Sequence, residues 1–297
     1  MGETVNQAAT SGAADSGHGV RHFDTHDADW VCLLDEKKVT AEPLVGRATD
    51  FLSKIHRASL LVEPADALSL YGVDCAPGFY IPTHHHDIDQ FLLVIRGELR
   101  MGNHRFHPGH GAFMPAGNPY NVQFGRAGGC FLEFRDIPAF RTAYTIRDAP
   151  KAGPGAPTAI PGWSKPEGDK RKTVFFDAET CPATTCTGLG PGDLGRSAPE
   201  ELAKALRYQA LHVIPGDGYS MISVATGGAL DFPRHCQDAD KIIYVLSGEM
   251  RLRAGDKPLR PGAGVFVPAW TPLEISTGAV GVKYLEFRKQ SGWHTDW

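Results

Sequence analysis

Two histidines separated by one residue are the strongest chemical signal in the sequence. They lie in the run Pro82-Thr83-His84-His85-His86, and Gln90 follows four residues later. In an extended strand, residues two apart point to the same face, so His84 and His86 are expected to converge while His85 points away. Two imidazoles presented in this way form half of a binding site for a first-row metal ion. The pattern predicts either a metal site or a metal-free pocket. In such a pocket the two rings would hydrogen-bond to neighbouring groups or to a substrate.

The segment around these histidines occurs twice in the chain. The offset between the copies is 151 residues in the first matching block and 153 residues in the two that follow. The blocks are residues 82–98 and 233–249, residues 108–116 and 261–269, and residues 131–135 and 284–288. Agreement over three blocks in the same order identifies a duplication.

Each copy has the residue pattern of an all-β domain. Short apolar runs such as 91–95 and 242–246 are bounded by Gly, Pro, Asn and Asp, at the spacing of a sandwich or barrel. One helix is predicted, over residues 198–208, where Ser197 could cap its start. Phe79, Phe91 and Phe113 are expected to pack in the core rather than to line a substrate pocket.

A stretch rich in Pro and Gly separates the two copies, and such a stretch resists regular structure. The predicted organisation is a flexible N-terminal tail over residues 1–25, an N-terminal domain over 26–148, a linker over 149–168 and a C-terminal domain over 169–297.

These motifs resemble those of the cupin superfamily, and the resemblance covers most of the chain outside the tail and the linker. Gln90 stands in place of the glutamate of the first cupin motif, and Tyr120 stands where the second motif has its histidine. The resemblance is carried by Gly78, His84, His86 and Gly97 in the first motif and by Gly109, Pro115 and Gly117 in the second. It implies two tandem double-stranded β-helix barrels of the cupin or jelly-roll type, an arrangement called a bicupin.

By this resemblance, His84, His86, Gln90 and Tyr120 are the expected metal ligands of the N-terminal barrel. An amide in place of a carboxylate removes a negative charge and a good oxygen donor. A phenol ordinarily ionises only near pH 10, so Tyr120 would ligate with the help of the metal or act instead as a general acid. Glu133 is a second catalytic candidate, facing the barrel interior as an acid, base or spare ligand, with an exposed edge position as the alternative.

The C-terminal barrel is predicted to have lost its metal site. His235 remains, but Gln237, Lys241 and Leu273 stand at the other three ligand positions. An unpaired ammonium in a protein interior is costly, so a buried Lys241 needs a partner. We expect a directly hydrogen-bonded pair between Lys241 and Glu286, with Asp240 as the other candidate.

The resemblance implies a metal-dependent enzyme that acts on a small organic molecule, first of all by dioxygenase-type oxidation at the N-terminal barrel. Its cofactor would be one divalent metal ion, Fe(II) first, with Zn, Mn, Ni or no metal as alternatives. Two other functions stay open: a non-oxidative isomerase, cyclase or lyase with Zn or no metal, and a non-catalytic small-molecule-binding or sensor protein.

Charge and composition exclude other classes of partner. A formal net charge of -4 and a pI near 6.3 argue against binding to nucleic acid or a membrane surface, and no dense basic run occurs. No signal peptide or membrane span is recognisable, and the six scattered cysteines are expected to be free thiols of a cytoplasmic protein. A homodimer is expected by family resemblance. His104, His107 and His110 are expected on an exposed hairpin.

Overall fold

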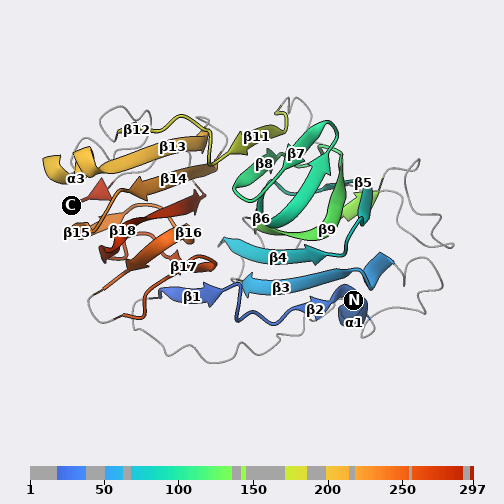
Figure 1. Cartoon of the computed structure of the whole chain (residues 1–297), viewed down its shortest axis with the longest axis horizontal. Helices are drawn as coiled ribbons and strands as arrows, with labels where there is room; N and C mark the ends of the chain where they lie inside the picture. Colours follow the sequence, from blue (N-terminus) through green and yellow to red (C-terminus); the bar gives the residue numbers. More distant parts are fainter. Residues whose placement is uncertain are drawn as a thin grey trace.

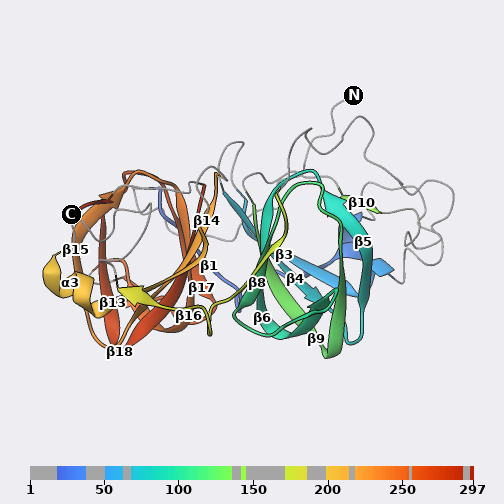
Figure 2. The ribbon, with the colours of Figure 1, turned by 90° about the horizontal axis from the view of Figure 1, so that it is seen from above.

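Two β-barrels lie side by side in the computed structural model (Figures 1 and 2). The structure describes residues 19–37, 51–62, 68–135, 142–144, 171–185, 199–213, 218–253, 256–289 and 295–297. The architecture is all-β, with two tandem jelly-roll barrels, as the sequence predicts. Each barrel is closed by strands that curve around an interior (Figure 2). Buried apolar side chains pack within each barrel.

The first barrel is built on a ten-stranded sheet in which the strands pair antiparallel. Its main path runs β11-β8-β6-β9-β4-β3-β2, while β5 pairs with β9 and β10, and β7 pairs with β6. The strands are β2 (Val31–Cys32), β3 (Ile55–Leu61), β4 (Ser69–Cys75), β5 (Tyr80–His86), β6 (Gln90–Met101), β7 (His104–Phe106), β8 (His110–Met114), β9 (Tyr120–Arg135), β10 (Thr142–Tyr144) and β11 (Val174–Asp177). A short helix, α1 (Leu33–Lys37), follows β2.

The second barrel repeats this plan in a nine-stranded sheet with the path β1-β17-β16-β18-β14-β13-β12. Its strands are β1 (Arg21–Asp24), β12 (Thr184–Thr185), β13 (Leu206–Val213), β14 (Ser220–Thr226), β15 (Asp231–Gln237), β16 (Lys241–Arg251), β17 (Ala263–Val267), β18 (Leu273–Arg288) and β19 (Thr295–Asp296). Here β15 pairs with β18 as β5 pairs with β9 in the first barrel.

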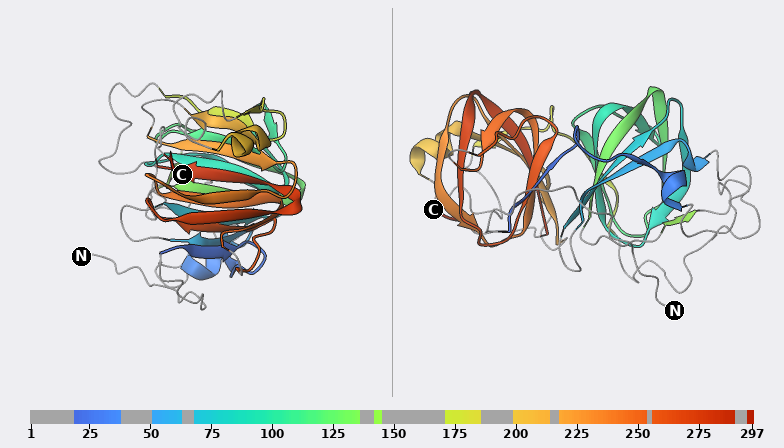
Figure 3. Two further views of the ribbon diagram at one scale, coloured as in Figure 1. Left: turned by 90° about the vertical axis from the view of Figure 1, so that its left-hand side faces the viewer. Right: turned by 90° about the horizontal axis from the view of Figure 1, so that it is seen from below.

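Two short strands are exchanged between the halves of the chain. Strand β1 pairs with β17 of the second barrel, and β11 pairs with β8 of the first. The right-hand view of Figure 3 shows the blue N-terminal segment passing from one barrel to the other. The expected division at residues 25 and 169 therefore does not describe these strands: residues 21–24 are not part of a tail, and 174–177 complete the first barrel. Residues 1–18 and the expected linker over 149–168 lie outside the described residues.

A glycine at the same place in each barrel explains part of the repeated motif. Gly97 and Gly248 have φ angles of 76° and 77°, in the left-handed region. A Cβ atom on Gly97 would lie 2.2 Å from the carbonyl oxygen of Gly128, and one on Gly248 would lie 2.1 Å from that of Gly281. Only glycine combines this backbone conformation with so close an approach of a neighbouring strand.

An aromatic core joins the two barrels. Phe287 of β18 lies with its ring centroid 5.2 Å from that of Phe91 and 5.4 Å from that of Phe134. Phe91, Phe113 and Phe134 are each at most 1% exposed and belong to the same apolar cluster as Phe287. Removing so much aromatic surface from water holds the barrels together. The expected core positions of Phe91 and Phe113 are confirmed, and Phe79 is buried within the first barrel.

The predicted helix is shorter than expected. The sequence predicts residues 198–208, but α3 spans Glu200–Ala205, and Leu206 already begins β13. Leu206 and Tyr208 are buried as inward residues of that strand, so packing overrides the local helical pattern. Ser197 lies outside the described residues. Neither α3 nor any other helix in the described ranges is long and apolar enough to cross a membrane.

The cysteines in the described part of the chain are free, as expected. They are Cys32, Cys75, Cys130, Cys181 and Cys236. Cys186 lies outside the described residues.

Candidate functional site

Three rings meet in the interior of the first barrel. His84 and His86 lie two residues apart on β5 and are 5% and 7% exposed. Their ring centroids are 5.2 Å apart in an edge-on arrangement. The first residue of β9, Tyr120, pairs with His84 across the two strands. Its ring centroid lies 4.4 Å from that of His84 and 6.0 Å from that of His86. The three ring-bearing residues expected at the site are therefore brought together.

His84 is held in one orientation and one tautomer. Its Nδ1 atom lies 2.7 Å from the carbonyl oxygen of Pro82. A carbonyl oxygen only accepts, so Nδ1 carries the hydrogen and Nε2 carries the lone pair of the neutral ring. Burial lowers the pKa of His84 from 6.5 to about 4. His84 is therefore neutral at neutral pH, with Nε2 unprotonated.

Three further polar side chains extend from Tyr120 in one hydrogen-bonded chain. Gln90 donates from Nε2 to the Tyr120 hydroxyl oxygen at 2.6 Å and accepts at Oε1 from Nε of Arg135 at 3.3 Å. Arg135 in turn forms an ion pair with Glu133. Gln90, Glu133 and Arg135 are at most 7% exposed. The chain runs Glu133–Arg135–Gln90–Tyr120, and it exists because β6 and β9 place Gln90 directly opposite Arg135.

Arg135 and Tyr71 are members of the site that sequence reasoning did not identify. The Arg135 guanidinium lies 5.1 Å from the centroid of the Tyr71 ring, and that of Arg57 lies 5.3 Å from the same centroid. A cation against an aromatic face is stabilised by the ring quadrupole. The sequence did carry a signal for Arg135, because Arg288 repeats it in the second copy.

Glu133 does not lie at an exposed edge. It faces the barrel interior, and its carboxylate is engaged by Arg135. This ion pair makes Glu133 a group that orients Arg135.

Two of the four expected metal ligands, Gln90 and Tyr120, are engaged in other bonds. Within the described residues, no group of three or more His, Cys, Asp or Glu side chains could hold a metal ion. Gln90 and Tyr120 are bonded to each other, and the amide oxygen of Gln90 also accepts from the Arg135 guanidinium. A divalent cation bound there would lie near the positive guanidinium of Arg135. The Glu133 carboxylate already balances that guanidinium and so would not balance a second cation. The two imidazoles are the donors that remain.

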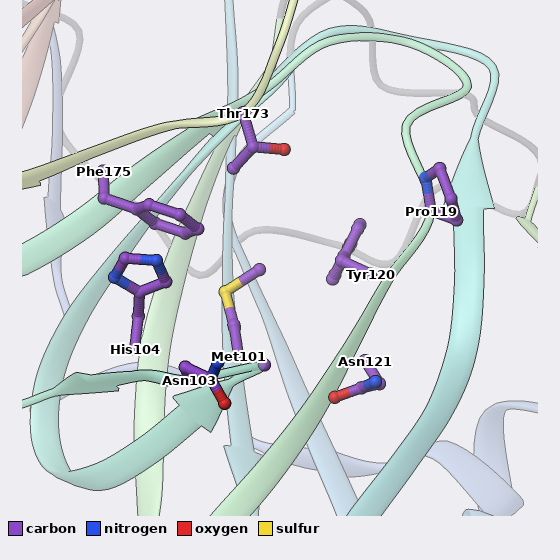
Figure 4. Close-up of a pocket in the computed structure, with 9 residues that line it drawn as sticks. Met101, Asn103, His104, Pro119, Tyr120, Asn121, Thr173 and Phe175 are labelled. Carbon is purple, nitrogen blue, oxygen red and sulfur yellow. The ribbon is translucent and has the colours of Figure 1, made fainter.

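An open pocket lies beside Tyr120 and has a volume of about 290 Å³. Residues of the β6–β7 turn, the start of β9 and β11 line it, among them His104, Tyr120 and Phe175. Figure 4 shows the His104 and Phe175 rings together on one side and Tyr120 on the other, with Met101 between them. His104 is exposed and lies on the β6–β7 hairpin, as expected, and it also forms part of the pocket wall.

The equivalent interior of the second barrel is an ionic cluster. Lys241 donates from Nζ to Oε1 of Gln237 at 2.7 Å, and the same nitrogen lies 3.6 Å from Oε1 of Glu286. Arg288 forms an ion pair with Glu286 and donates to Gln237 at 3.2 Å. Lys241 and Glu286 are thus an ion pair, but the expected direct hydrogen bond goes to Gln237 instead. Asp240, the other candidate, accepts from the backbone of Ala269.

His235 keeps the geometry of His84 although its barrel lacks the second imidazole. Its Nδ1 atom lies 2.9 Å from the carbonyl oxygen of Pro233, and Trp297 covers its ring at a centroid distance of 4.7 Å. Burial, and then the charge of Lys241, lower the pKa of His235 from 6.5 to about 4. Burial also lowers the pKa of Lys241 well below 10.5.

Comparisons with known proteins identify the arrangement of the chain. No protein-family model matches the sequence, and no curated protein matches it. Salicylate 1,2-dioxygenase from Pseudoaminobacter salicylatoxidans is 13% identical with a TM-score of 0.60, covering 95% of this chain and 86% of that one. A candidate dioxygenase from Nostoc punctiforme is 15% identical with a TM-score of 0.64, covering 93% and 84%. Oxalate decarboxylase from Bacillus subtilis is 14% identical with a TM-score of 0.54, covering 93% and 78%. At such identities the similarity establishes the fold and leaves the activity to the site.

Proposed function

We propose that this chain, a protein of the bicupin fold, is an enzyme whose N-terminal barrel catalyses a non-oxidative proton transfer on a small organic molecule. The observation that carries the proposal is the convergence of the His84 and His86 imidazoles with the Tyr120 phenol. A base and an acid held next to each other and presented to one substrate permit isomerisation or elimination. The substrate class is a small molecule with a C–H bond next to a carbonyl group.

His84 is the proposed general base. Its Nε2 is the unprotonated ring nitrogen, because Nδ1 donates to the Pro82 carbonyl and the ring is neutral at physiological pH. When Nε2 takes the proton, the C–H bond breaks and its electron pair forms a C=C bond. The protonated Nε2 then returns the proton to carbon while the enol hydroxyl gives its proton back to Tyr120, so that both side chains regain their starting forms. Return of the proton to a different carbon of a conjugated or hydroxyl-bearing enol completes an isomerisation, and the His86 ring lies beside His84 at this site.

Tyr120 is the proposed general acid. It gives its proton to the carbonyl oxygen, which becomes the hydroxyl of an enol. The N–H that Gln90 donates to the phenol oxygen stabilises the negative charge left on Tyr120. Arg135 fixes the amide of Gln90, and Glu133 fixes Arg135, so these two act as positioning residues.

The second candidate function is the metal-dependent dioxygenase that the motifs predict. It is favoured by one feature of His84, the Nδ1 hydrogen bond to a backbone carbonyl, which orients metal-bound histidines in general. Fe(II) is the first metal to consider, followed by Zn, Mn and Ni. Binding at four positions would require Gln90 to give up its bonds to Tyr120 and Arg135.

Solvent deuterium exchange tests the proposal directly. Acetophenone and 1-indanone are incubated with chelator-treated protein in D₂O, and deuterium next to the carbonyl is measured by mass spectrometry. Exchange is expected with the wild type and should fall about a hundredfold or more in His84→Asn and Tyr120→Phe. His235→Asn, at the equivalent position of the second barrel, is the matched control and should retain full exchange.

Metal content and oxygen uptake distinguish the proposed function from the dioxygenase alternative. The proposal expects equal, negligible metal in the wild type and in the His84→Ala/His86→Ala variant, and no oxygen uptake after Fe(II) is added. Stoichiometric iron in the wild type that the double variant loses, together with oxygen consumption, would establish the dioxygenase instead. Ligand binding without exchange or oxygen uptake would favour a non-catalytic sensor.

A further inference from the structure

We infer that the pocket beside Tyr120 binds a neutral, planar aromatic molecule, and that the second half of the chain supplies the wall that recognises it. The inference deepens the proposed function and rests on it only in taking Tyr120 as the group that meets the ligand. The pocket's volume of about 290 Å³ is at the lower end of the range of ligand pockets, which begins near about 300 Å³. That size suits a molecule with a single ring.

An aromatic wall is the first recognition feature. Phe175 lines the pocket and is 39% exposed, so part of its ring surface is open to a bound molecule. His104 stacks against it with ring centroids 3.9 Å apart and planes 29° apart, and Phe106 supports it from the edge at 5.6 Å. With its position fixed by these two rings, Phe175 can stack with a planar ligand at little cost in side-chain freedom.

The polar groups of the pocket are the second feature. Asn103 and Asn121 contribute amides, and Thr173 contributes a hydroxyl, while no Asp, Glu, Lys or Arg is among the described residues that line this pocket. A charged ligand would lose hydration here without gaining an opposite charge. Amides and hydroxyls instead suit the hydroxyl or carbonyl group of a neutral ligand.

The wall is positioned by both barrels through a strap, which we define as residues 171–179. At one end, Arg171 binds Asp89 of the first barrel through two hydrogen bonds of 2.5 and 3.2 Å. At the other end, Lys283 of the second barrel donates to the carbonyl oxygen of Ala178 at 2.6 Å and lies 3.2 Å from the Glu179 carboxylate. Thr173 and Phe175 lie between these anchors. The second barrel, which has no metal-type histidine pair, thereby helps to build the pocket of the first.

Three simple probes test the recognition: phenol, cyclohexanol and benzoate. Binding is followed by NMR from the shift of the His104 ring protons during titration of the full chain at neutral pH. Phenol should bind saturably, cyclohexanol more weakly because it cannot stack, and benzoate more weakly because it is charged. Phe175→Leu should weaken phenol binding about three- to tenfold, the effect of one aromatic contact.

Matched variants separate recognition from folding. Trp270→Leu alters another exposed aromatic residue, 56% exposed and absent from this pocket, and should leave phenol binding unchanged. Lys283→Met should weaken phenol binding by releasing one anchor of the strap. Absence of saturable phenol binding, equal binding of cyclohexanol or benzoate, or unchanged affinity in Phe175→Leu would each overturn the inference.

The same variants distinguish this inference from the proposed chemistry. His84 does not line the pocket, so His84→Asn should bind phenol normally while losing deuterium exchange. Exchange without phenol binding would retain the proposed function and remove the aromatic ligand class.

Discussion

Replacing Glu286 with glutamine should destabilise the second barrel far more than replacing its partner Lys241. Glu286 is 3% exposed, lies 3.6 Å from the Lys241 ammonium and forms an ion pair with Arg288. Lys241 and Arg288 are 1% and 0% exposed. Glu286→Gln therefore removes the carboxylate that both cations share, while the side-chain volume hardly changes.

The expected magnitudes follow from the geometry. Removing one partner from a buried ion pair costs about 3–5 kcal/mol, because the remaining charge is left uncompensated. Lys241→Met leaves the Arg288–Glu286 pair intact, and Gln237 still accepts from Arg288 at 3.2 Å. Replacement of a buried charge by an apolar side chain of similar length is then neutral or stabilising. The two variants should differ by at least about 3 kcal/mol in free energy of unfolding.

Urea denaturation followed by circular dichroism, with calorimetry as a second probe, measures this difference. A cost of about 3 kcal/mol corresponds to a fall in Tm of about 5 °C for a chain of this size. The Glu286→Gln/Lys241→Met double variant should recover part of the loss, because one excess cation is gone. The reasoning fails if Glu286→Gln stays within about 1 kcal/mol of the wild type while Lys241→Met loses more than about 3 kcal/mol.

Three further perturbations test other parts of the structure. The pKa of His235 is about 4 in the folded chain and ordinarily 6.5, so between these pH values the unfolded chain binds more protons. The contribution of neutral His235 to the free energy of unfolding is therefore complete above pH 6.5 and is lost as the pH falls towards 4. This loss of stability amounts to about 3 kcal/mol. In urea denaturation from pH 7 to pH 4, His235→Asn should lose less stability than the wild type, and identical pH profiles for the two proteins would contradict the prediction. Trp270 has a φ angle of 61° and is 56% exposed, so Trp270→Gly should be neutral or up to about 1 kcal/mol more stable in thermal unfolding, and a clear loss would contradict the strain. Gly97→Ala places a Cβ 2.2 Å from the Gly128 carbonyl oxygen and should cost at least about 2 kcal/mol, which a wild-type Tm would disprove.

Much of the fold follows from local pattern. The repeated blocks and the alternation of apolar residues predict two equivalent β-barrels, because strand periodicity needs no knowledge of distant contacts. The same periodicity places His84 and His86 on one face, and the structure brings their rings to 5.2 Å. The presence of Lys241 at a ligand position of the second copy is sufficient to predict a buried cation that needs partners.

The choice of partners was decided by tertiary structure. Sequence assigns Gln90 and Tyr120 to metal positions, but strand register places Arg135 opposite Gln90 and joins the three in a hydrogen-bonded chain. Local pattern cannot rank a metal against a guanidinium as the partner of one amide, since that depends on groups far apart in sequence.

The exchange of strands between the barrels lies beyond local pattern for the same reason. His104 and Phe175 stack because β11 leaves its own half of the chain to pair with β8. The sequence of a four-residue strand predicts its extended conformation but not which sheet edge it joins. Many sheet edges offer the same backbone hydrogen bonds. Sequence therefore determined the two barrels and the paired imidazoles, while long-range register decided which side chains surround them.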